Sequence, residues 1–129
     1  MPRYASSQPT DVELQILQVL WQRGPCTVRQ VHDTLASKRD TGYSTTLKMM
    51  QVMREKGLLT RDESVRPQLY AAAETRERTQ LQMLDDLAQK AFGGSAATLV
   101  MRVLSAQRVS PGELAEMQRL IREAKGDPS

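Results

Sequence analysis

The first part of the chain holds two short amphipathic segments that begin with the same pattern. In "TDVELQILQVLW", Thr10 is followed three residues later by Glu13, and apolar residues then recur at helical spacing as far as Gly24. In "TVRQVHDTLA", Thr27 is followed in the same way by Gln30. A Ser or Thr three residues ahead of a Glu or Gln is typical of the capping box that starts a helix. The pattern therefore predicts two helices, the first of which ends at Gly24.

The stretch "YSTTLKMMQVMREKGLLTR", residues 43–61, predicts a third helix with two unlike faces. It follows the breaker "DTG" at residues 40–42, so the second and third helices flank a turn, as they do in a helix-turn-helix. On a helical wheel with about 100° between residues, the inward side consists of Thr46, Met49, Met50 and Met53. The opposite side consists of Ser44, Thr45, Lys48, Gln51 and Glu55. The third helix is thus expected to bury its methionines and expose a polar face.

After Gly57 the hydrophobic pattern changes to that of β-strands. One strand is predicted from about residue 58 to 62 and a second from about residue 68 to 72, with a polar turn between them. Three helices followed by a two-stranded antiparallel ribbon form the layout of a winged helix. In that layout the ribbon packs beside the third helix, and its tip can touch the backbone of a nucleic acid. We therefore expect a winged helix-turn-helix domain over residues 1–74.

The rest of the chain, residues 75–129, predicts three more helices, at roughly 75–91, 95–106 and 111–125. The last one begins with a capping box, because Ser110 precedes Pro111 and Glu113. Short helices with apolar stripes bury little surface among themselves, which favours a dimerisation domain that completes its core with a second copy. The expected dimerisation residues are Leu84, Leu87, Leu99, Val103, Leu114, Met117, Leu120 and Ile121. The predicted fold class is mainly α.

Composition narrows the class of protein. Of 129 residues, 40% are hydrophobic and 26% charged, as in ordinary globular proteins, but only 4% are aromatic, so the core relies on aliphatic side chains and seven Met. The single cysteine, Cys26, excludes an internal disulfide, and with His32 as the single histidine we expect no metal site and no cofactor. The first residues contain no apolar segment and no later run is long enough to span a membrane, so a cytoplasmic protein is expected.

The distribution of charge bears on what the third helix contacts. The net charge is only +3, yet residues 38–66 contain seven cations against four acids. Small hydroxyl residues let a helix N-terminus approach DNA closely, Lys48 can reach guanine acceptors, and Gln51 can pair with adenine. Residues 44–51 alone are equally consistent with an ordinary solvated helix face. The surrounding cations favour a face that contacts DNA.

Several segments in order resemble one family. They are "TDVELQILQVLW", "TVRQVHDTLA", "YSTTLKMMQVMREKGLLTR", "QLYAA" and "FGGSAATLVMRVLS". Together they cover nearly the whole chain and are similar to the penicillinase repressors of the BlaI/MecI type, which include copper-responsive members. The resemblance implies a dimeric transcriptional repressor, with a winged-helix domain followed by a helical dimerisation domain, that binds palindromic operator DNA.

The resemblance also implies roles for particular residues. It places the recognition-helix positions on Ser44, Thr45 and Lys48, and the wing position near Arg66. Some members have an arginine that can reach phosphate where this chain has Val52, and Arg54 either compensates for its loss or leaves that contact unmade.

The resemblance raises the question of how such a repressor is released. Members that respond to β-lactams are inactivated when a membrane metallopeptidase cleaves an Asn-Phe bond after an "SLV"-like stretch. Here "TLVMRVL" puts Arg102 and Val103 at that place, which implies either no proteolytic control or a peptidase with another preference. Copper-responsive members carry paired cysteines near the C-terminus, and "LIREAKGDPS" has none, which argues against metal sensing by that route.

The leading hypothesis is a homodimeric repressor that binds an inverted-repeat operator through the third helix, with Ser44, Thr45, Lys48, Gln51, Arg54 and Arg66 as the DNA-binding residues. The alternative is a winged-helix adaptor whose third helix contacts a protein. An enzyme is not expected, because no nucleophile with a positioned base is evident. Arg3 could reach DNA from an N-terminal arm or have no contact, and the sequence leaves this open.

Overall fold

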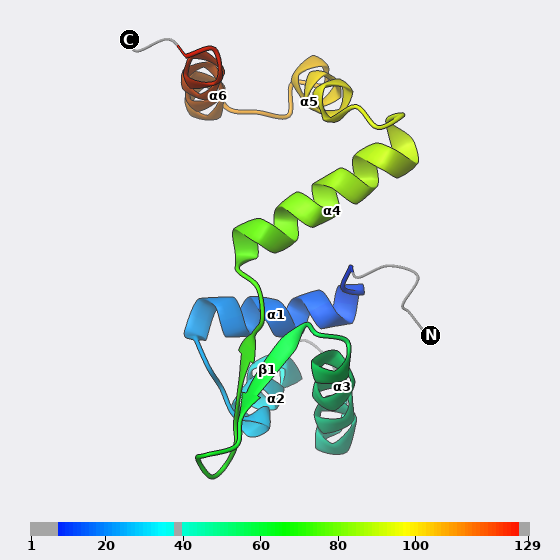
Figure 1. Ribbon diagram of the computed structural model, residues 1–129, viewed down its shortest axis with the longest axis vertical. Helices are drawn as coiled ribbons and strands as arrows, with labels where there is room; N and C mark the ends of the chain where they lie inside the picture. Colours follow the sequence, from blue (N-terminus) through cyan, green and yellow to red (C-terminus); the bar gives the residue numbers. More distant parts are fainter. Residues whose placement is uncertain (1–7, 38–39, 127–129) are drawn as a thin grey trace. The chain divides into compact units, whose positions relative to one another are not determined.

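The computed structural model describes residues 8–37 and 40–126, which form six helices and a two-stranded sheet (Figure 1). The elements are α1 (Asp11–Arg23), α2 (Val28–Ala36), α3 (Tyr43–Glu55), β1 (Leu59–Asp62), β2 (Leu69–Ala72), α4 (Arg76–Ala91), α5 (Ala96–Ser105) and α6 (Pro111–Ala124). The mainly α winged helix-turn-helix layout, followed by three helices, is confirmed. Arg3, Lys38 and Arg39 lie outside the described residues.

Helices α1, α2 and α6 begin where the sequence pattern predicts, because a capping box of local hydrogen bonds starts each of them. The Glu13 backbone N–H donates to Thr10 Oγ1 (3.2 Å), and the Thr10 N–H donates to Glu13 Oε1 (2.9 Å). The same reciprocal pair starts α2 at Thr27 and α6 at Ser110. At the end of α1, Gly24 adopts a φ of 86°, a conformation that a residue with a side chain rarely takes.

The wing is an antiparallel hairpin in which Leu59 pairs with Ala72 and Asp62 with Leu69. A third chain segment joins its edge, which the sequence did not predict. The Cys26 N–H donates to the Tyr70 carbonyl (2.9 Å), and the Tyr70 N–H donates to the Cys26 carbonyl (2.7 Å). This bridge ties the wing to the segment between α1 and α2.

One hydrophobic core lies among α1, α2, α3 and the wing. Its buried residues are Ile16, Leu17, Val19, Leu20, Cys26, Val28, Val31, Leu35, Met50, Met53, Leu59 and Tyr70. The inward face predicted for α3 is confirmed by Thr46, Met50 and Met53, which are buried, while Met49 is half-buried. Trp21 packs against this core, and its Nε1 also donates to the Glu74 carbonyl (2.9 Å).

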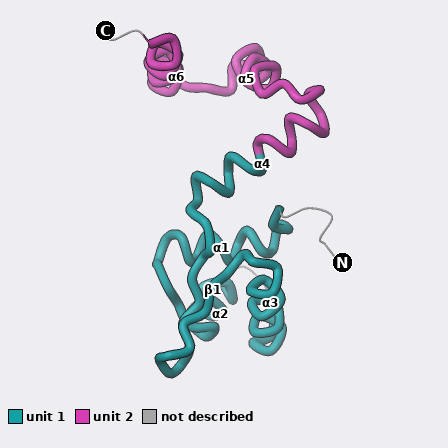
Figure 2. The backbone as a smooth tube through the Cα atoms, in the orientation of Figure 1, with its two compact units in different colours: residues 1–83 teal, residues 84–129 magenta. Residues whose placement is uncertain are grey.

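The chain divides into two compact units, one up to Met83 and one from Leu84 (Figure 2). The division falls inside α4, so the first half of that helix belongs with the winged-helix unit. The domain boundary expected from the sequence, between residues 74 and 75, lies just before α4 and stays a prediction.

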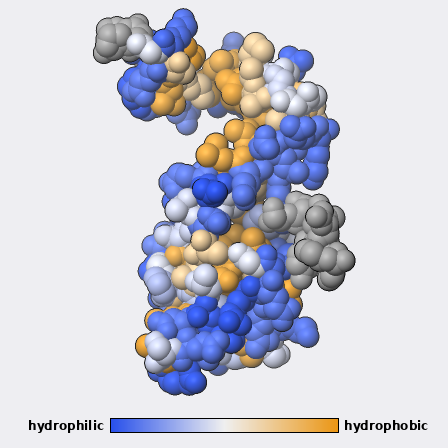
Figure 3. All heavy atoms as spheres, viewed as in Figure 1, coloured by the Kyte–Doolittle hydropathy of each residue, from blue (hydrophilic) through white to orange (hydrophobic). Residues whose placement is uncertain are grey.

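The second unit has little interior. Ala88 is buried, but α5 and α6 have no buried residue. Large apolar side chains are exposed to between 40% and 55%, namely those of Leu87, Val100, Met101, Leu114, Leu120 and Ile121. Apolar atoms of this unit reach the surface in the view of Figure 3. The helices of the second unit therefore carry apolar stripes that the single chain does not cover.

Candidate nucleic-acid interface

The polar face of α3 is exposed along its whole length. Ser44, Thr45, Lys48 and Gln51 all point away from the core, on the side opposite to Met50. Ser44, Thr45 and Lys48 line an open hollow on this face together with Met49 and Val52. Three of the residues predicted to bind DNA thus share one surface.

The start of α3 differs from those of α1, α2 and α6. Gly42 occupies its N-cap position and has no side chain, so no side-chain oxygen accepts a hydrogen bond from the first turn. The first-turn N–H groups carry the positive end of the helix dipole. Beside the hydroxyls of Ser44 and Thr45, this end of α3 suits the approach of an anionic group such as phosphate.

Lys48, in the middle of α3, and Lys56, at its C-terminal end, behave differently. Lys48 makes no hydrogen bond or ion pair with any described residue. Lys56, which the sequence analysis counted among the cations of the DNA-facing segment, turns inward instead. Its Nζ lies 2.7 Å from Glu13 Oε2 and 3.0 Å from Glu13 Oε1, with only 14% of the Lys56 side chain exposed. Lys56 therefore joins α1 to the end of α3 and is not part of the exposed face.

The arginines at the wing gather around one carboxylate. Glu63 Oε2 accepts hydrogen bonds from Arg61 Nη2 (2.6 Å) and Nε (3.1 Å), and from Arg54 Nη2 (3.4 Å). Arg66 Nη1 donates to the Glu63 carbonyl (2.8 Å). The Arg61 hydrogen bond and charge, followed by the charges of Arg54 and Arg66, hold the pKa of the Glu63 carboxyl below its ordinary value. Both predicted arginines, Arg54 and Arg66, thus lie at the same cluster.

A groove runs between α2, α3 and the wing. Gln51 of α3 and Arg61 of β1 both line it, together with Gln68 at the start of β2. On the α2 side, the Arg29 guanidinium lies 4.2 Å from the centre of the Tyr43 ring. The groove therefore runs from Gln51 on the polar face of α3 to Arg61 on the wing.

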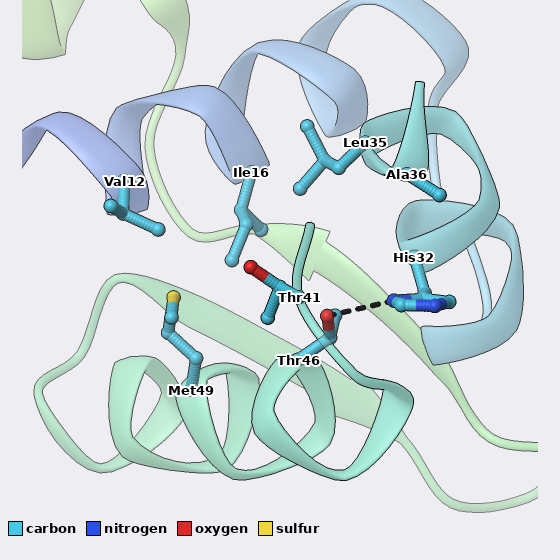
Figure 4. A pocket seen from close by; sticks show the side chains of 8 residues that line it. All are labelled: Val12, Ile16, His32, Leu35, Ala36, Thr41, Thr46 and Met49. Atoms are coloured by element: carbon cyan, nitrogen blue, oxygen red, sulfur yellow. Dashed lines mark hydrogen bonds between the residues drawn. The ribbon is translucent and has the colours of Figure 1, made fainter. Parts of the chain in front are cut away.

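A small apolar pocket lies between α1, α2 and α3 (Figure 4). Val12 and Ile16 come from α1, and Met49 comes from α3. At one side His32 Nδ1 lies 3.0 Å from Thr46 Oγ1, a hydrogen bond that joins α2 to α3. His32 therefore makes a structural contact within the helix-turn-helix.

The residues predicted to form a dimer interface lie on α4, α5 and α6. Leu87, Leu114, Leu120 and Ile121 are exposed, while Leu84, Leu99, Val103 and Met117 are half-buried. The bond between Arg102 and Val103 lies inside α5, with Arg102 exposed.

Within residues 8–37 and 40–126 no three His, Cys, Asp or Glu side chains come together as metal ligands. No described helix is both long enough and apolar enough to cross a membrane.

Two contacts of the site could not be predicted from the sequence. Glu13 was identified only as the partner of Thr10, and its second role with Lys56 joins residues 43 positions apart. Glu63 was counted only as one of four acids opposing the cations. Its sequence position between Arg61 and Arg66, in a polar turn, was the one available signal.

Comparisons with known proteins identify the family of this chain. The sequence model described as "Penicillinase repressor" matches residues 9–123. The chain is 31% identical over 115 residues to the transcriptional regulator BlaI from two strains of Mycobacterium tuberculosis, CDC 1551 / Oshkosh and ATCC 25618 / H37Rv. Each match covers 88% of this chain and 82% of the relative. Among solved structures, the crystal structure of RV1404 from M. tuberculosis aligns with a TM-score of 0.47 and 21% identity, covering 93% of this chain and 76% of that one.

A family of transcriptional regulators is not a class of enzymes, in agreement with the expectation from the sequence. The matched residues run from just before α1 to near the end of α6 and so include the winged helix, α4 and α5. The chain belongs to the penicillinase repressor family of DNA-binding transcriptional regulators.

Proposed function

We propose that this protein represses transcription by binding a palindromic DNA operator as a homodimer. The observation that carries the proposal is the exposed polar face of α3, where Ser44, Thr45 and Lys48 line one open hollow. Lys48 has no partner among the described residues, so its charge and donors are available to a base edge or a phosphate. The free energy needed to remove water from these polar side chains is offset when DNA supplies hydrogen-bond acceptors.

The proposed division of labour on DNA follows from where each residue lies. Ser44 and Thr45 would contact phosphate at the uncapped start of α3, and Lys48 and Gln51 would reach base edges in the major groove. Arg54 and Arg66 lie at the wing cluster and would contact flanking phosphates. Val52 is 36% exposed and its side chain offers no hydrogen bond. Arg54 lies about 200° further around α3 and contacts Glu63 of the wing, so it would reach a phosphate at a different place.

We assign dimerisation to residues 75–129, beginning with α4. Fully burying one Leu or Ile side chain contributes about 1.5–3 kcal/mol, and the second unit leaves several such side chains exposed. A second copy that covers the same stripes would bury them symmetrically, as a two-fold dimer requires. The dimer would then present two α3 helices to two half-sites of one operator, in the cytoplasm, where chromosomal DNA lies.

Proteolytic release by a membrane metallopeptidase rests on family membership alone. The candidate bond between Arg102 and Val103 is in a helix, so cleavage there requires α5 to open locally before a peptidase can bind it. An inducer that acts without cleavage is equally compatible with the fold.

The test is a titration of the full chain against the DNA upstream of its own gene, with random DNA as competitor, at two salt concentrations. We expect a discrete complex that resists competition and weakens as salt rises. In the same assay Lys48→Ala should lower operator affinity by roughly 1–3 kcal/mol and random-DNA affinity much less, because Lys48 is assigned to a base edge. Equal loss on both DNAs would make Lys48 a phosphate contact. No competition-resistant complex at either salt concentration would favour the adaptor that binds a protein through α3.

A further inference from the structure

The acidic residue Glu63 stands at the centre of the cationic side of the proposed interface. Its carboxylate accepts hydrogen bonds from Arg61 and Arg54, and its carbonyl accepts one from Arg66. The Glu63 side chain is still 51% exposed, so the cluster lies at the surface and not in the core. An acid in this place opposes the attraction of DNA phosphate, which calls for a physical reason.

The cluster of Glu63 with its arginines borders the polar face of α3. Arg54 is on α3, one turn beyond Gln51, and Arg61 lines the same groove as Gln51. Arg61 Nη1 also lies 3.5 Å from the Tyr70 hydroxyl, which fixes the guanidinium from a second side. A phosphate that followed α3 toward the wing would meet the two guanidinium groups that Glu63 now holds.

Carboxylate and phosphate oxygens compete for the same guanidinium donors. Both accept paired hydrogen bonds from the planar fork of an arginine. The Glu63 carboxyl is ionised at neutral pH, as that of an ordinary glutamate is, and it therefore remains an acceptor for these donors. Each arginine that moves to a phosphate must therefore give up a charged partner that it already has.

We infer that Glu63 is a specificity-determining positioning residue that occupies, in the free protein, the place of a DNA phosphate at Arg54 and Arg61. On random DNA the exchange of carboxylate for phosphate yields little, so these arginines contribute little to non-specific binding. On the operator, contacts along α3 fix the phosphate in register with guanidinium groups that Glu63 has already oriented. This inference rests on the proposed DNA binding and adds to it a residue that restrains non-specific attraction.

The test compares Glu63→Gln with the matched control Glu55→Gln. Glu55 is an exposed acid on α3 that forms no ion pair with any described residue, so both variants remove one negative charge near the interface. Affinity is measured for operator and for random DNA across a salt series. For Glu63→Gln we expect random-DNA affinity to rise roughly tenfold in the dimer at low salt, with a steeper salt dependence, because two arginines per chain become available to phosphate. Operator affinity should rise less, so the ratio of the two affinities falls.

The outcomes separate this inference from the proposed function. An equal rise for Glu63→Gln and Glu55→Gln, or a fall in both affinities with a lower melting temperature, would overturn the role of Glu63 while leaving operator binding intact. Failure of the wild-type chain to form any competition-resistant complex would overturn the proposed function itself.

A second variant tests the same restraint without changing the wing. Arg54→Gln alters one exposed side chain of α3 and leaves Glu63 in place. Because Arg54 already donates a hydrogen bond to Glu63, this variant should lower random-DNA affinity no more than about twofold, less than the loss of one unrestrained phosphate contact. In the Glu63→Gln background the same change should remove about half of the gain, because Arg54 is one of the two arginines that Glu63 holds. A large loss in the wild-type background, or no loss in the Glu63→Gln background, would contradict the inference.

Discussion

The two units of this chain solve the problem of a small protein in opposite ways. The first surrounds one core with three helices and a wing, and residues such as Val31, Met50 and Met53 have no exposed surface. The second unit consists of the end of α4 with α5 and α6, and it leaves the side chains of Leu120 and Ile121 about half exposed. The first unit buries its core within a single copy, and this core holds α3 with its polar face outward. In the proposed dimer a second copy would cover these apolar side chains of the second unit.

The largest expected difference comes from matched methionine substitutions. Met50→Ala in the first unit should lower the free energy of unfolding by roughly 2–5 kcal/mol, because it leaves a cavity in a closed core. Met117→Ala in the second unit should cost much less at low protein concentration, since Met117 is only half-buried there. Denaturant unfolding followed by the fluorescence of Trp21, the one tryptophan, reports the first unit. Similar losses for both variants would mean that the two units unfold together.

The next effect concerns the buried ion pair of the first unit. Lys56→Met leaves the Glu13 carboxylate buried without its cation and should cost on the order of 3 kcal/mol. Adding Glu13→Gln should recover much of that loss, while the amide can still accept from the Thr10 N–H. Operator affinity of the folded Lys56→Met variant should stay within about twofold of the wild type, in contrast to Lys48→Ala. A Lys56 variant that is stable but defective in DNA binding would contradict the inward placement of Lys56.

The sequence predicted the helices and the wing well because their signals are local. A capping box, a glycine at a helix end and an apolar period all act within a few residues, so Thr10, Thr27 and Ser110 marked true helix starts. The exposed face of α3 followed from the same periodicity.

What the sequence could not predict depends on contacts between distant residues. The inward turn of Lys56 needs Glu13 on another helix, and the bridge between Cys26 and Tyr70 joins segments with no pairing signal of their own. Lys56 and Arg61 are therefore not equivalent cations, because Lys56 pairs with Glu13 of α1 and Arg61 pairs with Glu63. Charge composition gives the number of cations but not their partners.

A smaller effect sharpens the contrast from the side of the second unit. Leu120→Ala should weaken self-association about tenfold, which corresponds to roughly 1.4 kcal/mol, and should leave the unfolding of the first unit unchanged. Sedimentation over a range of protein concentrations measures the first quantity and Trp21 fluorescence the second. Gln118→Ala, on the same helix at an exposed polar position, is the control. Self-association that is unaffected by Leu120→Ala would place the dimer interface elsewhere.

The smallest effect is the pH dependence of the wing. Hydrogen bonds from Arg61 lower the pKa of Glu63, and those from the Ser64 hydroxyl and N–H lower the pKa of Asp62. Because both pKa values are lower in the folded state, their stabilising contribution is present above the ordinary carboxyl pKa and is lost as the pH falls through the lowered values. Amide exchange and carboxyl chemical shifts of residues 62–66 should change at acid pH before the core does. A wing that stays as protected as the core at acid pH would contradict these hydrogen bonds.

The most direct test of the central claim is selection of DNA ligands from a random pool by the full chain at physiological salt. A dimer that reads DNA through two α3 helices should enrich an inverted repeat whose half-sites are about one helical turn, or a multiple of it, apart. Lys48→Ala should reduce the enrichment at specific positions within each half-site. Enrichment of a single asymmetric site, or of no sequence at all, would contradict a symmetric operator-binding repressor.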